Sequence, residues 1–435
     1  MRVIVIGAGF AGMAAACRLA GDGHVVTVVE KAPRLGGRAA SFERQGETLD
    51  YGQHVLLRAC GAAQGFLERV GALDAVSFQE SLAVPLLFEG RRWVLRSWPL
   101  PGVTHLAPGL LGYRPLSGRE RLAAAHAGLA LLASRSAKDE TFAAWLSRHG
   151  QTERIVQRFW DPVVIATLNA PSAAASFAAA RHVFRDAFLL PHGADMGLFT
   201  TPLATVFNAA RRYLEARGGS VELGAPIGAI SIRDGAACGV RLEDGREIGA
   251  DAVISAVPPD ALEPLARGLT DLESTVAAAG RLAWSPIVNV HLTFDRDVLA
   301  DPFAVGIDSP VQAVFRKGKT IVMSQSSAGD LIDLPDHEIV VKLSQALREL
   351  LPSARDAKVV DTLVLRHRRA TFVPSPGSDA LRPKSRTPIP ALYLAGDWTA
   401  TGWPSTIESA VLSGVFAAAA AERDMAPADA AATAA

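Results

Sequence analysis

The sequence predicts an α/β fold, in which a discontinuous Rossmann-type domain carries an inserted α+β domain. A β-branched run at 3–6 ends in a glycine-rich turn, and a small-residue helix separates it from a second β-branched run at 25–29. Short apolar runs of the same kind return far downstream, near 220–256 and 391–395. The long stretches between them differ in composition, so we interpret them as an insertion.

The expected elements follow one another in the order of a nucleotide-binding domain. A strand over 3–6, a helix over about 12–20 and a strand over 25–29 make one βαβ unit. Asp234-Gly235 and Asp244-Gly245 provide turns between further short strands. These strands are expected over 221–223, 227–232, 239–242 and 252–256. Near the end, a strand over 391–395 leads into a helix over about 406–420.

These elements set the expected domain boundaries. The nucleotide-binding domain takes 1–75, 201–268 and 381–424, and the substrate domain takes 76–200 and 269–380. The first inserted stretch is rich in arginine and alanine with helical character, and the second mixes strands and helices. The alanine-rich tail, 425–435, is expected to be disordered.

Composition narrows the class of partner. The chain has 435 residues, enough for two or three domains at ~150 residues each. Lysine plus arginine and aspartate plus glutamate are equal at 44 each, which argues against a nucleic-acid partner because no basic excess exists. Hydrophobic residues make up 49% of the chain, which fits a protein that handles apolar molecules or rests on a membrane; an alanine-rich core is the alternative.

The cysteines and the apolar runs bear on location. Cys17, Cys60 and Cys238 lie far apart without metal-ligand spacing, so we expect reduced thiols, no metal site and a cytoplasmic protein. The strand at 3–6 leaves no room for a signal peptide, and no run of ~18 apolar residues predicts a transmembrane helix. Any membrane contact is therefore expected to be peripheral, at the inner face.

The glycine-rich turn carries a nucleotide-binding pattern. Gly7 suits the tight turn, Gly9 lets the backbone approach a pyrophosphate, and Gly12 lets the helix pack closely on the strand. The helix N-terminus offers amide donors to phosphate. Glu30 closes the second strand, at the spacing where a carboxylate accepts hydrogen bonds from a ribose.

Further motifs resemble the FAD-binding signature of the amine oxidase, phytoene desaturase and protoporphyrinogen oxidase superfamily. Gly36-Gly37-Arg38 extends the first motif, and Leu394-Ala395-Gly396-Asp397-Trp398 is similar to the second FAD motif. Pro226-Ile227 resembles the strand that meets the adenine, and Thr406-Ile407 opens a helix aimed at the flavin. The resemblance implies that FAD is the cofactor and that Asp397 lies on its ribitol side. Arg38 is expected to hold the cofactor.

Two absences refine this expectation. No cysteine follows Cys238, which excludes a cysteinyl flavin link near the C-terminal motif, so FAD is expected to bind non-covalently. No second GxGxxG motif is present, so the electron donor is expected to be external.

A finer resemblance, to the hydroxysqualene dehydroxylases, spans residues 1 to about 420. The loop Asp50-Tyr51-Gly52-Gln53-His54-Val55-Leu56-Leu57 is similar, which places Gly52 at the cofactor, and so is Leu168-Asn169-Ala170-Pro171. The remaining similar segments are Arg185-Asp186, Val311-Gln312-Ala313-Val314-Phe315, Arg369-Ala370-Thr371-Phe372, Arg382-Pro383 and Thr401 to Ala410. The chain departs from the family pattern at Arg58, Cys60, Trp403, Ser405 and Ser409.

This resemblance implies a reaction of hopanoid or triterpene biosynthesis. An allylic hydroxyl of hydroxysqualene is replaced by hydrogen, with two electrons from reduced FAD, to give squalene. Such chemistry needs a dry apolar cavity and one acid. His54 is the first candidate acid, since histidine donates protons near neutral pH; a ring that is merely hydrogen-bonded is the alternative. Asp161 is the second, although an aspartate before proline commonly caps a helix or forms a turn.

Three other functions stay open. A carotenoid or phytoene-type desaturase runs similar redox chemistry in the opposite direction. An amine oxidase needs an aromatic cage, and this chain has only four tyrosines. A non-catalytic, flavin-containing lipid carrier would lack turnover.

One segment is a candidate for membrane contact. Trp98-Pro99-Leu100-Pro101 through Leu106, Leu110, Leu111 and Tyr113 supplies apolar and aromatic groups. It is bracketed by Arg91, Arg92, Arg96, Arg114, Arg119 and Arg121. The alternative is a core segment with a solvated arginine face.

Overall fold

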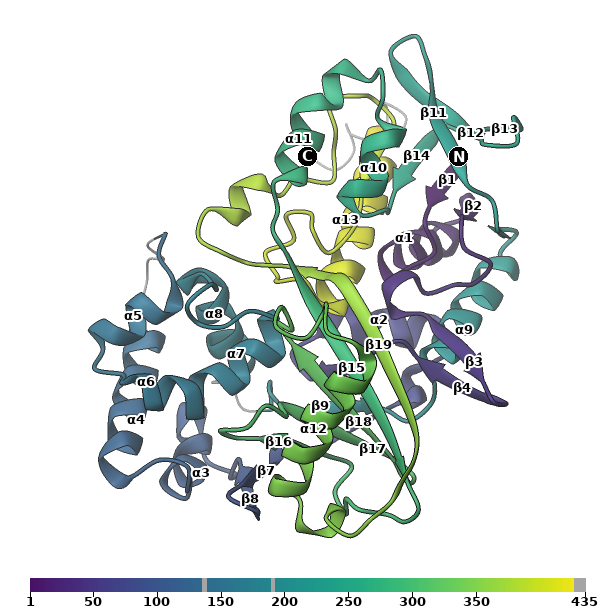
Figure 1. Ribbon diagram of the computed structural model, residues 1–435. Helices are drawn as coiled ribbons and strands as arrows, with labels where there is room; N and C mark the ends of the chain where they lie inside the picture. Colours follow the sequence, from purple (N-terminus) through teal and green to yellow (C-terminus); the bar gives the residue numbers. More distant parts are fainter. Residues whose placement is uncertain (135–138, 189–191, 426–435) are drawn as a thin grey trace.

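The computed structural model describes residues 1–134, 139–188 and 192–425 (Figure 1). It is an α/β protein with a parallel five-stranded sheet and a seven-stranded, mainly antiparallel sheet, which confirms the predicted fold class. The expected disordered tail lies, from residue 426 on, outside the described residues.

The parallel sheet gathers strands from both ends of the chain. Its strand order is β10 (Ser220–Leu223), β2 (Val25–Glu30), β1 (Arg2–Ile6), β14 (Ala252–Ser255) and β20 (Leu392–Leu394). All five strands lie within the three segments that we propose for the nucleotide-binding domain. A central parallel strand is buried on both faces, which explains its unbroken apolar run.

The two faces of this sheet are covered differently, because side chains alternate along a strand. Val3 and Val5 of β1 pack into a core with helices on one face, while Ile4 and Ile6 pack on the other. The helices of the first face are α1 (Phe10–Gly21), α2 (Gly61–Arg69), α9 (Leu203–Glu215) and α13 (Ile407–Met425). The second face meets a sheet of β11 (Ile227–Arg233), β12 (Ala236–Leu242) and β13 (Glu247–Gly249), with α10 (Pro259–Leu265) and α11 (Glu273–Gly280).

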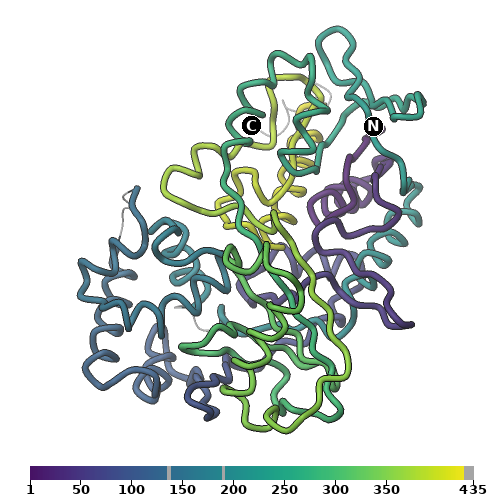
Figure 2. Tube along the Cα trace, viewed as in Figure 1, coloured from purple at the N-terminus to yellow at the C-terminus, as the bar shows by residue number. Residues whose placement is uncertain are grey.

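Helices α1 and α13 lie side by side, so segments from near the two ends of the sequence pack together (Figure 2). A Cβ at Gly414 of α13 would lie 2.1 Å from the carbonyl oxygen of Ala11 in α1, so only glycine allows this approach. Helix α1 begins two residues before the expected start, at Phe10. Helix α13 begins after Thr406, whose side chain accepts a hydrogen bond from the Ser409 amide at 3.2 Å.

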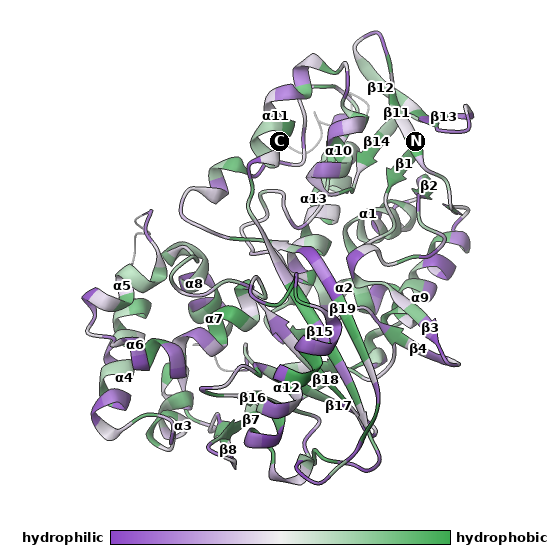
Figure 3. Ribbon diagram, viewed as in Figure 1, coloured by the Kyte–Doolittle hydropathy of each residue, from purple (hydrophilic) through white to green (hydrophobic). Residues whose placement is uncertain are grey.

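The seven-stranded sheet forms the second half of the molecule. Its order is β19 (Val359–Phe372), β15 (Trp284–Phe294), β18 (Thr320–Ser326), β17 (Ala313–Lys317), β16 (Phe303–Gly306), β7 (Ala83–Phe88) and β8 (Arg91–Arg96). Strands β16 and β7 pair in parallel. Helix α12 (Asp336–Leu350) packs on this sheet, and the apolar colour of β15 in Figure 3 marks the core beneath it.

A helical lobe lies beside this sheet (Figure 1). It contains α3 (Ala107–Leu111), α4 (Gly118–Ala133), α5 (Phe142–Arg148), α6 (Glu153–Ile155), α7 (Asp161–Leu168) and α8 (Phe177–Val183). Its core is aromatic, with Phe142 packed against Trp145, Trp160 and Phe184. The stretch 76–200 was expected to be helical. It contains these helices, but strands β7 and β8 lie in it as well.

Two small sheets connect the halves. Strand β9 (Met196–Phe199) pairs with β5 (Val55–Leu57) on one side and β6 (Val76–Phe78) on the other. The hairpin of β3 (Ser41–Arg44) and β4 (Glu47–Asp50) precedes the loop that carries Gly52 and His54. Pairing of β5 with β9 holds that loop between the two large sheets.

Candidate functional site

One large cavity runs between the parallel sheet, the seven-stranded sheet and the helical lobe. Its volume is about 1450 Å³. Single small-molecule sites usually measure ~300–1,000 Å³, so this cavity has room for a cofactor and a second molecule. The cavity is lined by nearly every residue that the sequence assigned to the cofactor: Gly7, Gly9, Glu30, Gly36, Gly37, Arg38, Gly52, Ile227, Gly396, Asp397, Thr406 and Ile407. The exception, Gly12, packs inside the turn.

In the first glycine turn, two glycines are required by the fold and one leaves space for a ligand. Gly7 has a φ of +102°, and a Cβ on Gly12 would lie 1.9 Å from the Gly7 carbonyl oxygen, so both positions are required by the backbone. Gly9 has an ordinary extended conformation, and its Cβ would come only within 3.9 Å of the Gly36 carbonyl oxygen. The protein itself leaves room at Gly9, which points to a ligand as the reason for glycine.

A second glycine turn lies against the first. The Gly36 amide donates to the Ala8 carbonyl at 2.9 Å, and a Cβ on Gly37 would lie 3.5 Å from the Gly9 Cα. The two turns therefore present bare backbone at the N-terminus of α1, which has no side-chain cap. Free amides and the positive end of the helix dipole suit the diphosphate of FAD.

Glu30 stands at the end of β2, on the cavity wall. Its carboxylate accepts hydrogen bonds from the Ala8 amide at 2.9 Å and the Ala32 amide at 2.8 Å. Each oxygen keeps a further lone pair. The buried carboxylate can thus accept ribose hydroxyls while it ties the first glycine turn to the segment after β2, which fits the expected role.

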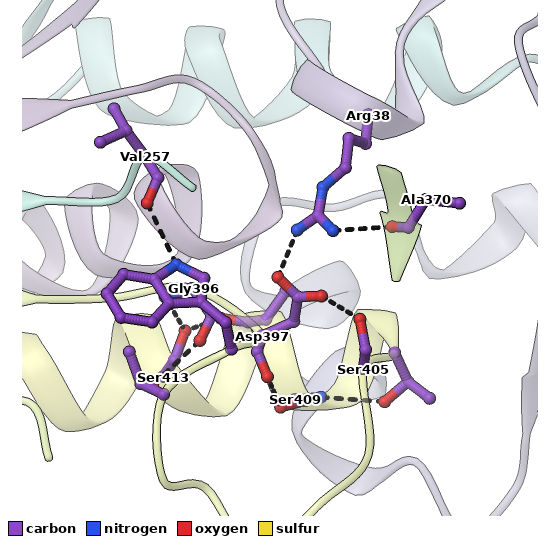
Figure 4. A network of polar contacts seen from close by, with 12 residues as sticks. Arg38, Val257, Ala370, Gly396, Asp397, Ser405, Ser409 and Ser413 are labelled. Atoms are coloured by element: carbon purple, nitrogen blue, oxygen red, sulfur yellow. Dashed lines mark hydrogen bonds and ion pairs between the residues drawn. The ribbon is translucent and has the colours of Figure 1, made fainter. Parts of the chain in front are cut away.

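Asp397 is the centre of a polar network at the other end of the cofactor motifs (Figure 4). Its carboxylate accepts from Arg38 and from the Ser405 hydroxyl. Arg38 also donates to the Ala370 carbonyl at 2.7 Å, and the Ser409 hydroxyl donates to the Asp397 carbonyl at 3.1 Å. Two of the departures from the family pattern, Ser405 and Ser409, therefore both bind Asp397.

The neighbours of Asp397 are fixed in the same way. Gly396 has a φ of +140°, and its amide donates to the Ser413 hydroxyl at 2.7 Å. The buried Trp398 donates from Nε1 to the Val257 carbonyl at 3.1 Å. These contacts anchor the strand end β20 between α13 and the loop after β14. Hydrogen-bond donors and acceptors around Asp397 therefore lie where the ribitol chain of FAD is expected, so these residues fit the cofactor.

His54 lies in a cluster of polar groups on the cavity wall. The Tyr51 carbonyl accepts from His367 Nε2 at 3.0 Å and from Asn289 Nδ2 at 3.4 Å. A Cβ on Gly52 would lie 3.6 Å from both Asn289 Nδ2 and His54 Cε1. Within the described residues, His54 Nδ1 and Asn289 Oδ1 are buried without hydrogen-bond partners. Burial lowers the pKa of His54, which favours the neutral ring.

Asp161 lines the same cavity but is engaged within its own lobe. Its Oδ1 accepts from the Ser172 amide at 2.9 Å and from the Ser172 hydroxyl at 2.5 Å. Its backbone is helical and continues the π-helical turn over Val156–Trp160, so Asp161 does not form the turn left open above; its carboxylate instead holds the segment after α7. Asn169, at the end of α7, likewise donates to Thr371 Oγ1 at 2.9 Å and to the Ser285 carbonyl at 3.2 Å.

Sequence reasoning missed several residues of the site. Glu408 lies in the first turn of α13, but it accepts from the Ala62 and Ala63 amides at 2.9 and 2.7 Å and so caps α2. His182 lines the cavity, and Asp186 contacts its ring at 2.7 Å. The spacing of four residues within a helical stretch is the signal that could have found this pair.

The cavity wall beyond the cofactor motifs is mainly apolar. Side chains from the helical lobe and the seven-stranded sheet include Leu86, Leu95, Phe159, Val163, Ile165, Phe303, Val305 and Phe315. Such a wall favours an apolar second molecule. Among residues 1–134, 139–188 and 192–425, no helix is both long and apolar enough to cross a membrane.

Comparisons with known proteins agree with this geometry. The family model described as flavin containing amine oxidoreductase matches residues 10–421. The chain is 29% identical to a hydroxysqualene dehydroxylase of Sinorhizobium fredii, over 96% of this chain and 97% of that protein. It is 25% identical to a probable zeta-carotene desaturase of Synechococcus elongatus, over 96% and 98%.

Solved structures share the fold. An oxidoreductase from Methanosarcina mazei superposes with a TM-score of 0.75 at 20% identity, covering 95% of this chain and 99% of that one. A putrescine oxidase bound to putrescine superposes with a TM-score of 0.73 at 17% identity, covering 97% and 99%.

Proposed function

The chain belongs to the family of flavin-containing amine oxidoreductases, and from this premise we propose that it reductively dehydroxylates hydroxysqualene to squalene. Membership makes it an FAD-dependent oxidoreductase. The observation that carries the finer proposal is the apolar wall of the second part of the cavity, which suits a long isoprenoid. The relatives named hydroxysqualene dehydroxylase, matched over nearly the whole chain, support it.

The residues divide the work of the proposed reaction. The two glycine turns hold the diphosphate, Glu30 the ribose, and Arg38 with Asp397 the ribitol side of FAD. When bound and reduced, FAD supplies the two electrons with which C–H replaces C–OH. Apolar side chains such as Val163 and Ile165 exclude water from the reacting carbon.

A carotenoid-type desaturase is the second candidate. It is favoured by the match to the probable zeta-carotene desaturase, and the apolar cavity suits a polyene equally well. The two reactions differ in the direction of electron flow. A desaturase leaves its flavin reduced by substrate, whereas a dehydroxylase leaves it oxidised.

We expect the anaerobically photoreduced protein to convert hydroxysqualene to squalene, with one squalene formed per flavin reoxidised. Gas chromatography and the flavin absorbance measure the two products. Ile165→Glu should lower the rate at least tenfold while flavin content stays unchanged, because it places a charge in the apolar wall.

Val341→Glu is the matched control, because this side chain is 64% exposed on α12 and lies outside the cavity. Its rate should equal that of the wild type. A flavin that stays reduced with hydroxysqualene, yet is reduced from the oxidised form by a carotenoid, would favour the desaturase instead.

Membrane contact is part of the proposal, since a triterpene gains ~0.8 kcal/mol for each CH₂-sized unit removed from water. In the structure, the segment proposed for membrane contact is partly exposed and partly buried. Trp98, Leu100 and Leu111 are 57%, 41% and 63% exposed, but Tyr113 is buried and donates to the Arg158 carbonyl at 2.5 Å. Tyr113 and Leu95 also line the cavity, so the exposed apolar groups lie on the elements that bound one end of it.

We expect the protein to float with anionic liposomes, and Trp98→Glu with Leu111→Glu to remain in the soluble fraction with its flavin. The exposed Arg91, Arg96, Arg114 and Arg119 should make flotation weaken as salt rises. Val341→Glu, with almost the same exposure as Leu111, should float like the wild type. Equal flotation of the double variant and the control would refute the membrane surface.

A further inference from the structure

His182 and Asp186 form a hydrogen-bonded pair at the cavity. His182 lies in the last turn of α8, and Asp186 follows one turn later in a π-helical turn over Phe184–Phe188. His182 Nδ1 and Asp186 Oδ2 are 2.7 Å apart. Among the described residues, His182 Nε2 is buried without a hydrogen-bond partner.

The ring of His182 is held beside the cofactor motifs. It packs edge-to-face on Trp403, with centroids 4.6 Å apart and an interplanar angle of 85°. Trp403 belongs to the segment between Asp397 and Thr406, and both His182 and Trp403 line the cavity. The histidine therefore stands where the helical lobe meets the C-terminal cofactor motif, next to the apolar wall.

This pairing fixes the chemistry of the ring. A carboxylate at Nδ1 holds the proton there, so Nε2 accepts a proton in the neutral ring and donates one in the charged ring. The Asp186 side chain is 46% exposed and that of His182 24%, so the pair can exchange protons with solvent on the side of Asp186. The two acids expected from the sequence lack this arrangement. Asp161 is bound to Ser172, and His54 Nδ1 has no hydrogen-bond partner in the described part of the chain.

On the proposed function, on which this inference rests, we propose that His182 is a catalytic residue that protonates the leaving hydroxyl, and that Asp186 is its positioning residue. The C–O bond breaks with its electron pair on oxygen, the oxygen takes the proton from Nε2, and water leaves. The carbon gains two electrons and one hydrogen from the reduced flavin, which becomes oxidised. His182 then regains its proton from solvent.

The surroundings set the direction of the pH dependence. Burial lowers the pKa of His182, while the negative charges of Asp186 and Asp379 oppose this shift. The net pKa lies below the ordinary histidine value of about 6.5. Because the protonated ring is the active form, the rate should fall as pH rises through this lowered pKa.

His182→Gln and Asp186→Asn, both in the FAD-loaded protein, test the inference. His182→Gln should slow single-turnover reoxidation by hydroxysqualene about 100-fold and abolish the fall of the rate with rising pH. Asp186→Asn should move the pH profile to lower pH, because it removes the charge that stabilises the protonated ring. Flavin content and circular dichroism should not change in either variant.

A readout independent of turnover completes the test. The NMR titration of the His182 ring should give the same pKa as the kinetic profile, and Asp186→Asn should lower both together. His126→Gln, on α4 in the same lobe, should match the wild type. If the wild type turns over and His182→Gln equals it, the assignment of His182 fails and the proposed function stands. If the wild type does not turn over, the proposed function fails, and the catalytic role of His182 fails with it.

Discussion

Replacing Gly9 with valine should give a folded protein that no longer retains FAD. The backbone at Gly9 is extended, and a Cβ there would come no nearer than 3.9 Å to its nearest neighbour among the described residues, the Gly36 carbonyl oxygen. The new side chain instead occupies the space through which the diphosphate meets the bare backbone of the two glycine turns. Overpacking costs about 1–3 kcal/mol, so FAD should bind roughly ten to a hundred times more weakly.

Gel filtration followed by flavin absorbance measures the retained cofactor, and circular dichroism measures the fold. Gly65→Val is the matched control, since Gly65 is an exposed glycine of α2 and a Cβ there would meet open space among the described residues. Gly12→Val should instead fail to fold, because its Cβ would lie 1.9 Å from the Gly7 carbonyl oxygen. Stoichiometric FAD in Gly9→Val would contradict the diphosphate assignment.

The first βαβ unit could be predicted from the sequence because its signals are local. Alternation between β-branched and small residues fixes β1, α1 and β2, and Gly7 and Gly36 have the positive φ that their turns require. The same local signals predicted β14 and α13 within a few residues. Each of these elements is read from residues that are neighbours in the chain.

The second half resisted prediction because its contacts are distant in sequence. Strands β7 and β8 lie in a stretch whose average composition is helical, and β7 pairs with β16, where Leu86 faces Val305. No local pattern announces such a pairing. The parallel contact is decided by tertiary packing. The hairpin of β7 and β8 does have a local signal, the Glu89-Gly90 turn, but an interpretation from average composition missed it.

The candidate site shows the same division. The role of Glu408 could not be predicted locally, because a carboxylate in the first turn normally stabilises its own helix, whereas the oxygens of Glu408 lie at the amides of Ala62 and Ala63. His182 was overlooked because its place in the site depends on a contact with Trp403, which is distant from it in the sequence. The motif residues proposed for the cofactor line the cavity, while groups that become part of a site only through packing were not predicted.

Arg382 is the residue whose loss should most destabilise the cofactor end of the site. It is 8% exposed, and its Nη2 donates to the carbonyls of Thr399 at 2.5 Å and Trp403 at 2.8 Å. A longer contact of 3.3 Å reaches the carbonyl of Asp397. The guanidinium also pairs with Asp379 and lies 4.9 Å from the ring centroid of Phe372. The Arg382 side chain thus donates hydrogen bonds to the backbone carbonyls of the loop that contains Asp397 and Trp403.

Arg382→Ala should therefore lower the free energy of unfolding by about 3–5 kcal/mol, because it removes the charged hydrogen bonds that one buried guanidinium donates to the carbonyls of Thr399, Trp403 and Asp397. FAD should also dissociate faster, since the loop around Asp397 loses its support. Arg382→Lys should rescue little, because a single ammonium group cannot both reach the carbonyls that Nη2 contacts and keep the Nη1 contact with Asp379. Urea unfolding and the rate of flavin release measure the two effects.

Arg386→Ala, which removes an exposed ion pair with Asp424, is the control and should change neither measurably. If Arg382→Ala unfolds like Arg386→Ala, the loop is held by other contacts, and the order of Asp397 must come from Arg38, Ser405 and Ser409 alone.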